Sequence, residues 1–174
     1  PMEEEYTTKM AEQAGMPVFF LDAYVPLVEL DAVISDGYYG TYQLTNYLIK
    51  QGHRKIGYVG SVDENSSIAD RYWGYRRSLR ENQIEFQKDW EIPDRYKKGK
   101  ILDKILDTPG DIEAYVCNCD HTAHFVIRDL EKAGYGVPED VSVVGFDNYL
   151  PFGMEQNRIT SYEVDKERMA RICV

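Results

Sequence analysis

The sequence contains little cysteine, no long hydrophobic run and no stretch that resembles a targeting signal. Its three cysteines, Cys117, Cys119 and Cys173, are odd in number and lack the spacing of a disulfide framework. We therefore expect reduced thiols and a cytoplasmic setting. No apolar run approaches the roughly 20 residues that a membrane helix requires. Residues 1–15 are acidic and polar, so we expect no signal peptide there and no contact with a membrane.

Basic residues are also scarce, since 20 lysines and arginines stand against 30 aspartates and glutamates, giving a net charge of −10. Nucleic-acid backbones require a basic face, but the basic residues gather only in short clusters at 53–55, 76–77 and 97–98. We therefore expect this chain itself to make no nucleic-acid contact. A phosphate-binding loop is missing too, because Gly134 and Gly136 lack a third glycine and a preceding strand.

What the sequence does contain is an alternation of strand-like and helix-like segments. The patterns predict helices over 4–15, 37–51, 69–82, 97–107, 120–132 and 165–173, and strands over 17–21, 32–34, 55–60, 90–92, 114–117, 141–146 and 159–164. This alternation is typical of an α/β protein with a doubly wound parallel sheet and helices on both faces. The pattern opens on a helix and stops inside a helix, so we expect a piece of a longer protein.

The segment 137–148 carries the clearest sign of a binding site. Residues 141–144 form a valine-rich, β-branched run suited to a buried strand, and Gly145 lets another group approach its backbone. Asp147 then stands at the carboxyl end of the strand, where open α/β sheets bind ligands. An acid there accepts hydrogen bonds from hydroxyl-rich molecules as readily as it pairs with cations. The segment therefore predicts a small-molecule-binding lobe.

Seven segments carry short motifs whose order and spacing hold from about Gly15 to the end of the chain. They are 15–22 (GMPVFFLD), 36–40 (DGYYG), 48–56 (LIKQGHRKI), 71–75 (RYWGY), 120–123 (DHTA), 134–147 (GYGVPEDVSVVGFD) and 159–165 (ITSYEVD). Together they resemble the lactose-repressor/galactose-repressor (LacI/GalR) family of bacterial transcription regulators. The details look closest to regulators from Gram-positive bacteria.

The resemblance implies a two-lobed, periplasmic-binding-protein-like core behind a helix-turn-helix headpiece, of which this chain is mainly the C-terminal lobe. Residues 1–34 would be a remnant of the N-terminal lobe, 35–161 the C-terminal lobe, and 162–174 the crossover back. By the same resemblance, we expect the headpiece and the first part of the N-terminal lobe to be absent from this chain. The resemblance also implies a homodimeric regulator without a cofactor. It would bind a sugar or sugar derivative between the lobes and operator DNA only through the missing headpiece.

The same resemblance points to Arg71 and Asp147 as the two anchors of the effector. The arginine would project from the start of a helix into the cleft, where its planar fork of donors suits hydroxyls and carboxylates. Asp147 would supply acceptors opposite it, and Asp22 matches a position that lines the cleft from the other lobe. The structural alternatives are a surface ion pair of Arg71 with Asp70 or Glu64, and a helix-cap or loop role for Asp147.

Further candidates surround these anchors. Many family members have asparagine where this chain has Cys119, and since a thiol is a poor donor, His121 is the expected substitute for that contact. Asp120 is expected to cap the following helix. Ser67, Trp73 and the turn at 93–94 are weaker candidates, and Trp73 fits a core role equally well.

Three other functions can be compared with this interpretation. Cys117, Cys119, His121 and His124 could be read as a metal cluster, but no second ligand set completes a tetrahedral site, so no metal is expected. No nucleophile–base pair or metal set supports an enzyme, so none is expected. A periplasmic-type sugar receptor for transport has the same fold and stays as the alternative.

Overall fold

A central parallel sheet organises the molecule, for which a computed structural model describes residues 4–96, 99–151 and 159–174. Its five strands lie in the order β4-β3-β5-β6-β7, and every neighbouring pair is parallel. The strands are β3 (Ile56–Val59), β4 (Glu91–Ile92), β5 (Ala114–Cys117), β6 (Ser142–Asp147) and β7 (Thr160–Glu163). Because all strands run the same way, their carboxyl ends meet at one edge of the sheet.

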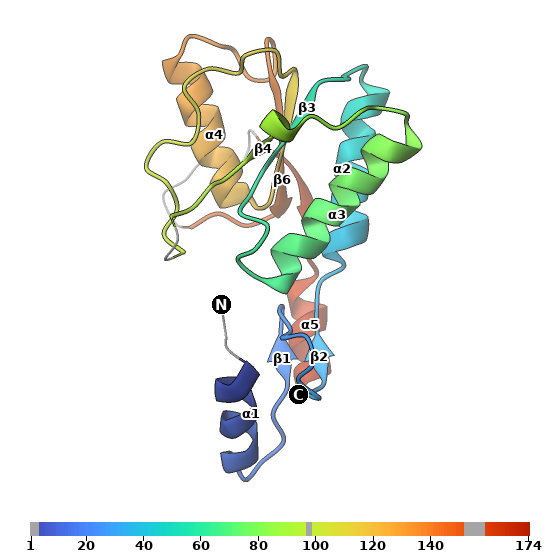
Figure 1. Ribbon diagram of the computed structural model, residues 1–174, viewed down its shortest axis with the longest axis vertical. Helices are drawn as coiled ribbons and strands as arrows, with labels where there is room; N and C mark the ends of the chain where they lie inside the picture. The colour runs from blue at the N-terminus through green and yellow to red at the C-terminus, as the bar shows by residue number, and fades with distance from the viewer. Residues whose placement is uncertain (1–3, 97–98, 152–158) are drawn as a thin grey trace.

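Helices cover both faces of this sheet (Figure 1). α2 (Gly37–Lys50) and α3 (Ser66–Glu81) pack on one face, and α4 (Asp120–Lys132) packs on the other. Successive strand side chains point to opposite faces, so Tyr58 joins the core under α2 and α3, whereas Tyr115 joins the core under α4. The prediction of a doubly wound α/β fold is confirmed.

The two helices on the first face cross at very close range because α3 has a glycine at the crossing. A Cβ on Gly74 would lie 2.0 Å from the carbonyl oxygen of Tyr38 in α2. Both helices also begin at side-chain caps, since Asp36 and Asn65 each accept from a backbone amide three residues further on. The start of α3 is therefore fixed in position and direction.

A smaller unit lies below the main sheet in Figure 1 and combines segments from the two ends of the sequence. β1 (Phe20–Leu21) and β2 (Ala32–Val33) pair in parallel, and α1 (Glu4–Gln13) precedes them. α5 (Lys166–Cys173) contacts β2 and begins at Asp165, whose side chain caps the helix as predicted. This unit carries Asp22, the residue that follows β1, toward the main sheet.

One predicted helix is wrong. Residues 97–98 lie outside the described ranges, and the rest of the helix expected over 97–107 is irregular chain. The amides of Ile105 and Leu106 donate to the carboxylate of Asp129 in α4 instead of to a helical carbonyl. These tertiary bonds satisfy the backbone, while Leu106 still buries its side chain against the core. The helical spacing of the apolar residues therefore reflects burial rather than a helix. A short 3₁₀-helix η1 (Lys88–Trp90) precedes β4.

Candidate functional site

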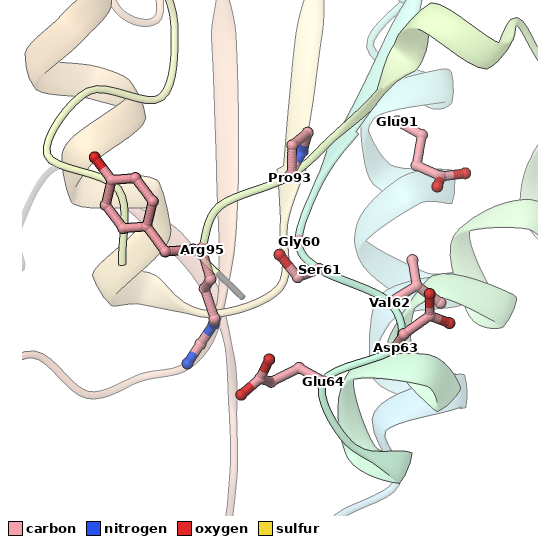
Figure 2. Close-up of a pocket in the computed structure, with 9 residues that line it drawn as sticks. Gly60, Ser61, Val62, Asp63, Glu64, Glu91, Pro93 and Arg95 are labelled. Atoms are coloured by element: carbon pink, nitrogen blue, oxygen red, sulfur yellow. The ribbon is translucent and has the colours of Figure 1, made fainter. Parts of the chain in front are cut away.

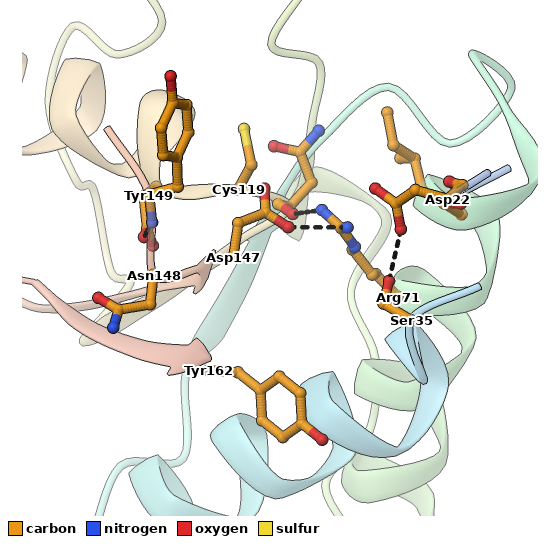
Figure 3. A network of polar contacts seen from close by, with 12 residues as sticks. Asp22, Ser35, Arg71, Cys119, Asp147, Asn148, Tyr149 and Tyr162 are labelled. Carbon is orange, nitrogen blue, oxygen red and sulfur yellow. Dashed lines mark hydrogen bonds and ion pairs between the residues drawn. The ribbon is translucent and has the colours of Figure 1, made fainter. Parts of the chain in front are cut away.

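Arg71 and Asp147 meet at the carboxyl edge of the sheet, although they belong to separate crossover units. Arg71 lies in the second turn of α3, and Asp147 is the last residue of β6. Nη2 of Arg71 donates to Oδ1 of Asp147 across 3.0 Å (Figure 3). Arg71 is only 5% exposed, so it does not form the alternative surface ion pair. The structure therefore brings these two predicted residues together.

Further contacts fix the Arg71 guanidinium. Nη1 donates to the backbone oxygen of Asn118 at 2.6 Å, and the guanidinium carbon lies 4.0 Å from the ring centroid of Phe146. Gly37 leaves room for the arginine stem, because a Cβ there would lie 3.0 Å from Cγ of Arg71. A guanidinium has five N–H donors, and these two hydrogen bonds use two of them.

Asp147 occupies an unusual electrostatic and conformational position. Burial raises the pKa of Asp147 to about 6. The charge of Arg71 opposes this rise, whereas Asp22 and Asp120 add to it. Asp147 and the following Asn148 have φ angles of 99° and 45°, a backbone conformation that costs an L-residue roughly 1–3 kcal/mol and is common at binding sites.

Asp22 reaches this group from the smaller unit. It has a φ of 55°, and its carboxylate accepts from the hydroxyl of Ser35 at 2.8 Å. Its backbone carbonyl accepts from the hydroxyl of Ser67 at 2.6 Å, and Ser67 lies in the first turn of α3. Ser67 therefore ties the smaller unit to the helix that carries Arg71, while the Asp22 carboxylate faces the charges of the site.

The prediction that Asp120 caps α4 is wrong. The cap residue is Cys119, which makes no side-chain cap bond, and Asp120 is a buried residue of the first turn. The Asp120 carboxylate accepts from the amide of Tyr149 at 2.9 Å and from the hydroxyl of Ser161 at 2.7 Å. A Cβ on Gly145 would lie 2.1 Å from Oδ1 of Asp120. The group that approaches Gly145 is therefore this carboxylate.

Of the candidates at the start of α4, Cys119 lies near Asp147, whereas the contacts of His121 are with other residues. Burial raises the pKa of the Cys119 thiol, the charge of Asp147 adds to this rise, and the charge of Arg95 opposes it. Figure 3 shows the thiol next to Asp147. His121 packs on Phe125, with ring centroids 5.2 Å apart, and burial lowers its pKa, with the charge of Arg95 acting in the same direction.

Trp73 is not brought into this group. It lies two residues beyond Arg71 in α3, which turns it roughly 200° around the helix axis. Its ring is 55% exposed and packs edge-on against Tyr72 at 5.2 Å. Trp73 is therefore neither a core residue nor a neighbour of the anchors. It lines a separate hollow with Arg76 and other residues of α3.

Sequence reasoning missed residues that complete the site. Asn118 comes directly after β5, just as Asp147 stands at the end of β6. Its position at the end of a strand could therefore have identified it. Phe146 precedes Asp147 and gave no signal beyond burial. The amine of Lys166 donates to the backbone oxygen of Asp147 at 2.9 Å, a contact that only the tertiary structure reveals.

A hollow of about 550 Å³ lies at the carboxyl ends of β3 and β4 (Figure 2). It is lined by 60–64, Glu91, Pro93, Arg95 and Tyr96. The side chains of Arg95 and Glu64 extend toward each other across it, and Pro93 forms part of its wall. Its size lies within the range typical of small-molecule sites, roughly 300–1,000 Å³. Pro93 of the turn at 93–94 therefore borders a space that a ligand could enter, whereas Asp94 is buried behind it.

Two kinds of feature are missing from the ranges that the structure describes. No group of three or more histidine, cysteine, aspartate or glutamate side chains there could hold a metal ion. Cys117, part of the alternative metal cluster, is buried in the core under α4. No helix within the same ranges is long and apolar enough to cross a membrane.

A parallel α/β sheet with an ion pair at its carboxyl edge is typical of α/β lobes, which bind ligands at that edge. The chain belongs to the periplasmic binding protein-like domain family, which it matches over residues 45–174, in the form found in LacI/GalR regulators. The resemblance predicted from the sequence motifs is confirmed.

Known relatives agree with this assignment. The HTH-type transcriptional repressor PurR of Pectobacterium carotovorum is 28% identical over 144 residues, which cover 81% of this chain and 42% of the repressor. The chain thus spans less than half the length of this relative.

Solved structures show the same fold. The transcriptional regulator CelR in complex with cellobiose has a TM-score of 0.80 at 27% identity, covering 94% of this chain and 52% of that one. A LacI family regulator from Lactobacillus casei with bound sucrose has a TM-score of 0.75 at 21% identity, covering 98% of this chain and 66% of that one. At that identity the likeness shows the fold alone.

Proposed function

We propose that this chain is the effector-sensing portion of a sugar-responsive, DNA-binding transcription regulator. The observation that carries the proposal is the ion pair of Arg71 and Asp147 at the carboxyl edge of the sheet. The guanidinium retains free N–H donors, and the carboxylate retains acceptor positions, so both kinds of group stand side by side. Sugar hydroxyls donate and accept, which suits this pair. The cellobiose bound to CelR supports a sugar as the effector class.

We further propose the lobe boundaries expected from the family, with 1–34 and 162–174 in the N-terminal lobe and 35–161 in the C-terminal lobe. Asp22 would then face the anchors from the other lobe, and the effector would bind between the lobes. The hydrogen bond from Ser67 to the Asp22 carbonyl crosses this boundary and supports the placement. A ligand that prefers the closed form shifts the equilibrium by its differential affinity, typically about 1–3 kcal/mol.

The wider role concerns the longer protein. Its helix-turn-helix headpiece would bind operator DNA, and closure of the lobes would change that binding. The proposed regulator is a cytoplasmic homodimer, and this chain is its binding module rather than an enzyme. The repressor and regulator names of the relatives favour this role over a transport receptor.

Calorimetric titration of the full-length gene product with glucose, cellobiose, sucrose and maltose tests the proposal. Arg71→Lys and Asp147→Asn should each weaken binding about tenfold or more, because a hydrogen bond to a charged group is worth about 1.5–3 kcal/mol. Asp111→Asn is the matched control, since this exposed carboxylate pairs with Lys55 at the opposite edge of the sheet. Wild-type affinity in both site variants, or binding of no sugar at all, contradicts the proposal.

A further inference from the structure

A second carboxylate, Asp94, lies behind the anchor pair and is completely buried. It follows β4, and its Oδ1 accepts from the backbone amide of Ser61 at 2.8 Å. Its Oδ2 accepts from the hydroxyl of Thr122 at 2.8 Å, the side-chain amide of Asn118 at 3.1 Å and Nε of Arg95 at 3.2 Å. One side chain thus joins the segments that follow β3, β4 and β5 to the first turn of α4.

Asn118 connects this group to Arg71. While its side chain donates to Asp94, its backbone carbonyl accepts from Arg71 at 2.6 Å, the shorter of the two hydrogen bonds that the guanidinium makes here. Gly60 permits this arrangement, because a Cβ there would lie 2.8 Å from Cβ of Asn118. Hydrogen bonds therefore run without a gap from Asp94 through Asn118 and Arg71 to Asp147.

We propose that Asp94 is a positioning residue of the effector site, which fixes Arg71 through Asn118. The inference rests on the proposed function as far as the ligand is concerned, but the positioning is a property of the unliganded chain. A carboxylate suits position 94 because it accepts from all four of these partners. An asparagine there keeps its oxygen for the Ser61 amide and turns its NH₂ group toward Nε of Arg95, which can only donate.

Asp147 offers a readout of where Arg71 lies. The charge of Arg71 lowers the pKa of Asp147, whereas the neighbouring carboxylates of Asp22 and Asp120 raise it. Other titratable groups close to Asp147 are the amine of Lys166 and the thiol of Cys119. Among these groups, Arg71 is the one whose side chain donates a hydrogen bond to the Asp147 carboxylate. If Arg71 moves away, this bond and the attraction of its charge weaken, so the pKa of Asp147 must rise.

A carbon-13 NMR titration of the Asp147 carboxyl in the ligand-free chain tests the inference. Asp94→Asn and Asn118→Ala both break the link to Arg71, and each should raise the Asp147 midpoint by about half a pKa unit or more. Asn118→Ala leaves Asp94 three donors, so it decides the question if Asp94→Asn does not fold. Thr122→Val is the matched control: it also removes one donor from Oδ2 of Asp94 but lies off the path, and the midpoint should stay at the wild-type value.

An unchanged midpoint in folded Asn118→Ala overturns the inference. An equal rise in Thr122→Val does so too, because it would indicate general loosening around Asp94. Failure of every sugar titration would refute the proposed function and leave this experiment standing, since no ligand is used. With a sugar that binds, Asn118→Ala should weaken affinity about fivefold, roughly 1 kcal/mol, and Thr122→Val should not.

Discussion

The raised pKa of Asp147 predicts that the free energy of unfolding depends on pH, and that Asp147→Asn removes this part of the pH dependence. An acid with a higher pKa in the folded state binds its proton more tightly there, so its contribution to stability is complete below its ordinary value of 3.8. That contribution is lost as the pH rises through the folded value of about 6. Asp147→Asn cannot titrate. The difference in unfolding free energy between wild type and variant therefore isolates this group.

The size of the effect follows from the two pKa values. A rise from 3.8 to about 6 corresponds to about 3 kcal/mol, because one pKa unit is worth about 1.4 kcal/mol. The Asp147 side chain is 30% exposed, so solvent screens part of the effect, and about 2 kcal/mol is the value we expect. This is a large share of a typical total stability of about 5–15 kcal/mol.

Urea unfolding followed by circular dichroism from pH 4 to pH 7.5 measures this quantity. Urea carries no charge, so it leaves the ion pair unscreened. The stability of wild type relative to Asp147→Asn should fall by about 2 kcal/mol between pH 4 and pH 7. Asp111→Asn serves as the control, because it changes an exposed carboxylate at the other edge of the sheet. Its unfolding free energy should keep the fall between pH 4 and pH 7 that the wild type shows.

A wild-type-minus-variant difference that stays constant over this range would refute the reasoning, because it would mean that Asp147 titrates normally. An opposite slope would also refute it. That result would mean that the attraction of Arg71 outweighs the cost of burying the carboxylate.

Three further predictions concern the same region. Gly145→Ala should destabilise the fold by about 1–3 kcal/mol in urea unfolding, because its Cβ would overlap Asp120. Gly136→Ala is the control: the nearest contacts of its Cβ would be 3.3 Å away, so it should cost less than half of that. Asp120→Asn should cost about 1–3 kcal/mol, since both partners of the carboxylate are donors, and full wild-type stability would contradict this assignment. In calorimetry, glucose 6-phosphate should bind about tenfold more weakly than glucose, because Arg71 is already paired with Asp147; tighter binding of the phosphate would show that Arg71 exchanges partners.

The sequence predicted those parts of the site that depend on the ends of regular elements. The run up to Asp147 marks a buried strand by its β-branched residues, and parallel strands bring their carboxyl ends together wherever the sheet forms. Arg71 was identified by family resemblance, because it stands three residues before Gly74 in the motif over 71–75. The core could be predicted in outline, because alternation along β3, β5 and β6 assigns side chains to the two faces.

The parts that could not be predicted depend on contacts between distant segments. Nothing local distinguishes a helix cap from the buried role of Asp120, whose partners lie 29 and 41 residues away. The apolar spacing within 97–107 satisfies a helical pattern, yet the carboxylate of Asp129 supplies acceptors that make the helix unnecessary. The turn at 93–94 was only a weaker candidate for ligand contact, and the buried role of Asp94 could not be predicted, because its four donors come from separate segments.

The glycine contact between α2 and α3 has a mechanical consequence. With a carbonyl of one helix lying against the Cα of Gly74, the pair cannot slide without a steric clash, so the two helices translate as a single rigid block. Arg71 is one turn before this contact. A displacement of Arg71 along the axis of α3 would therefore move α2 with it.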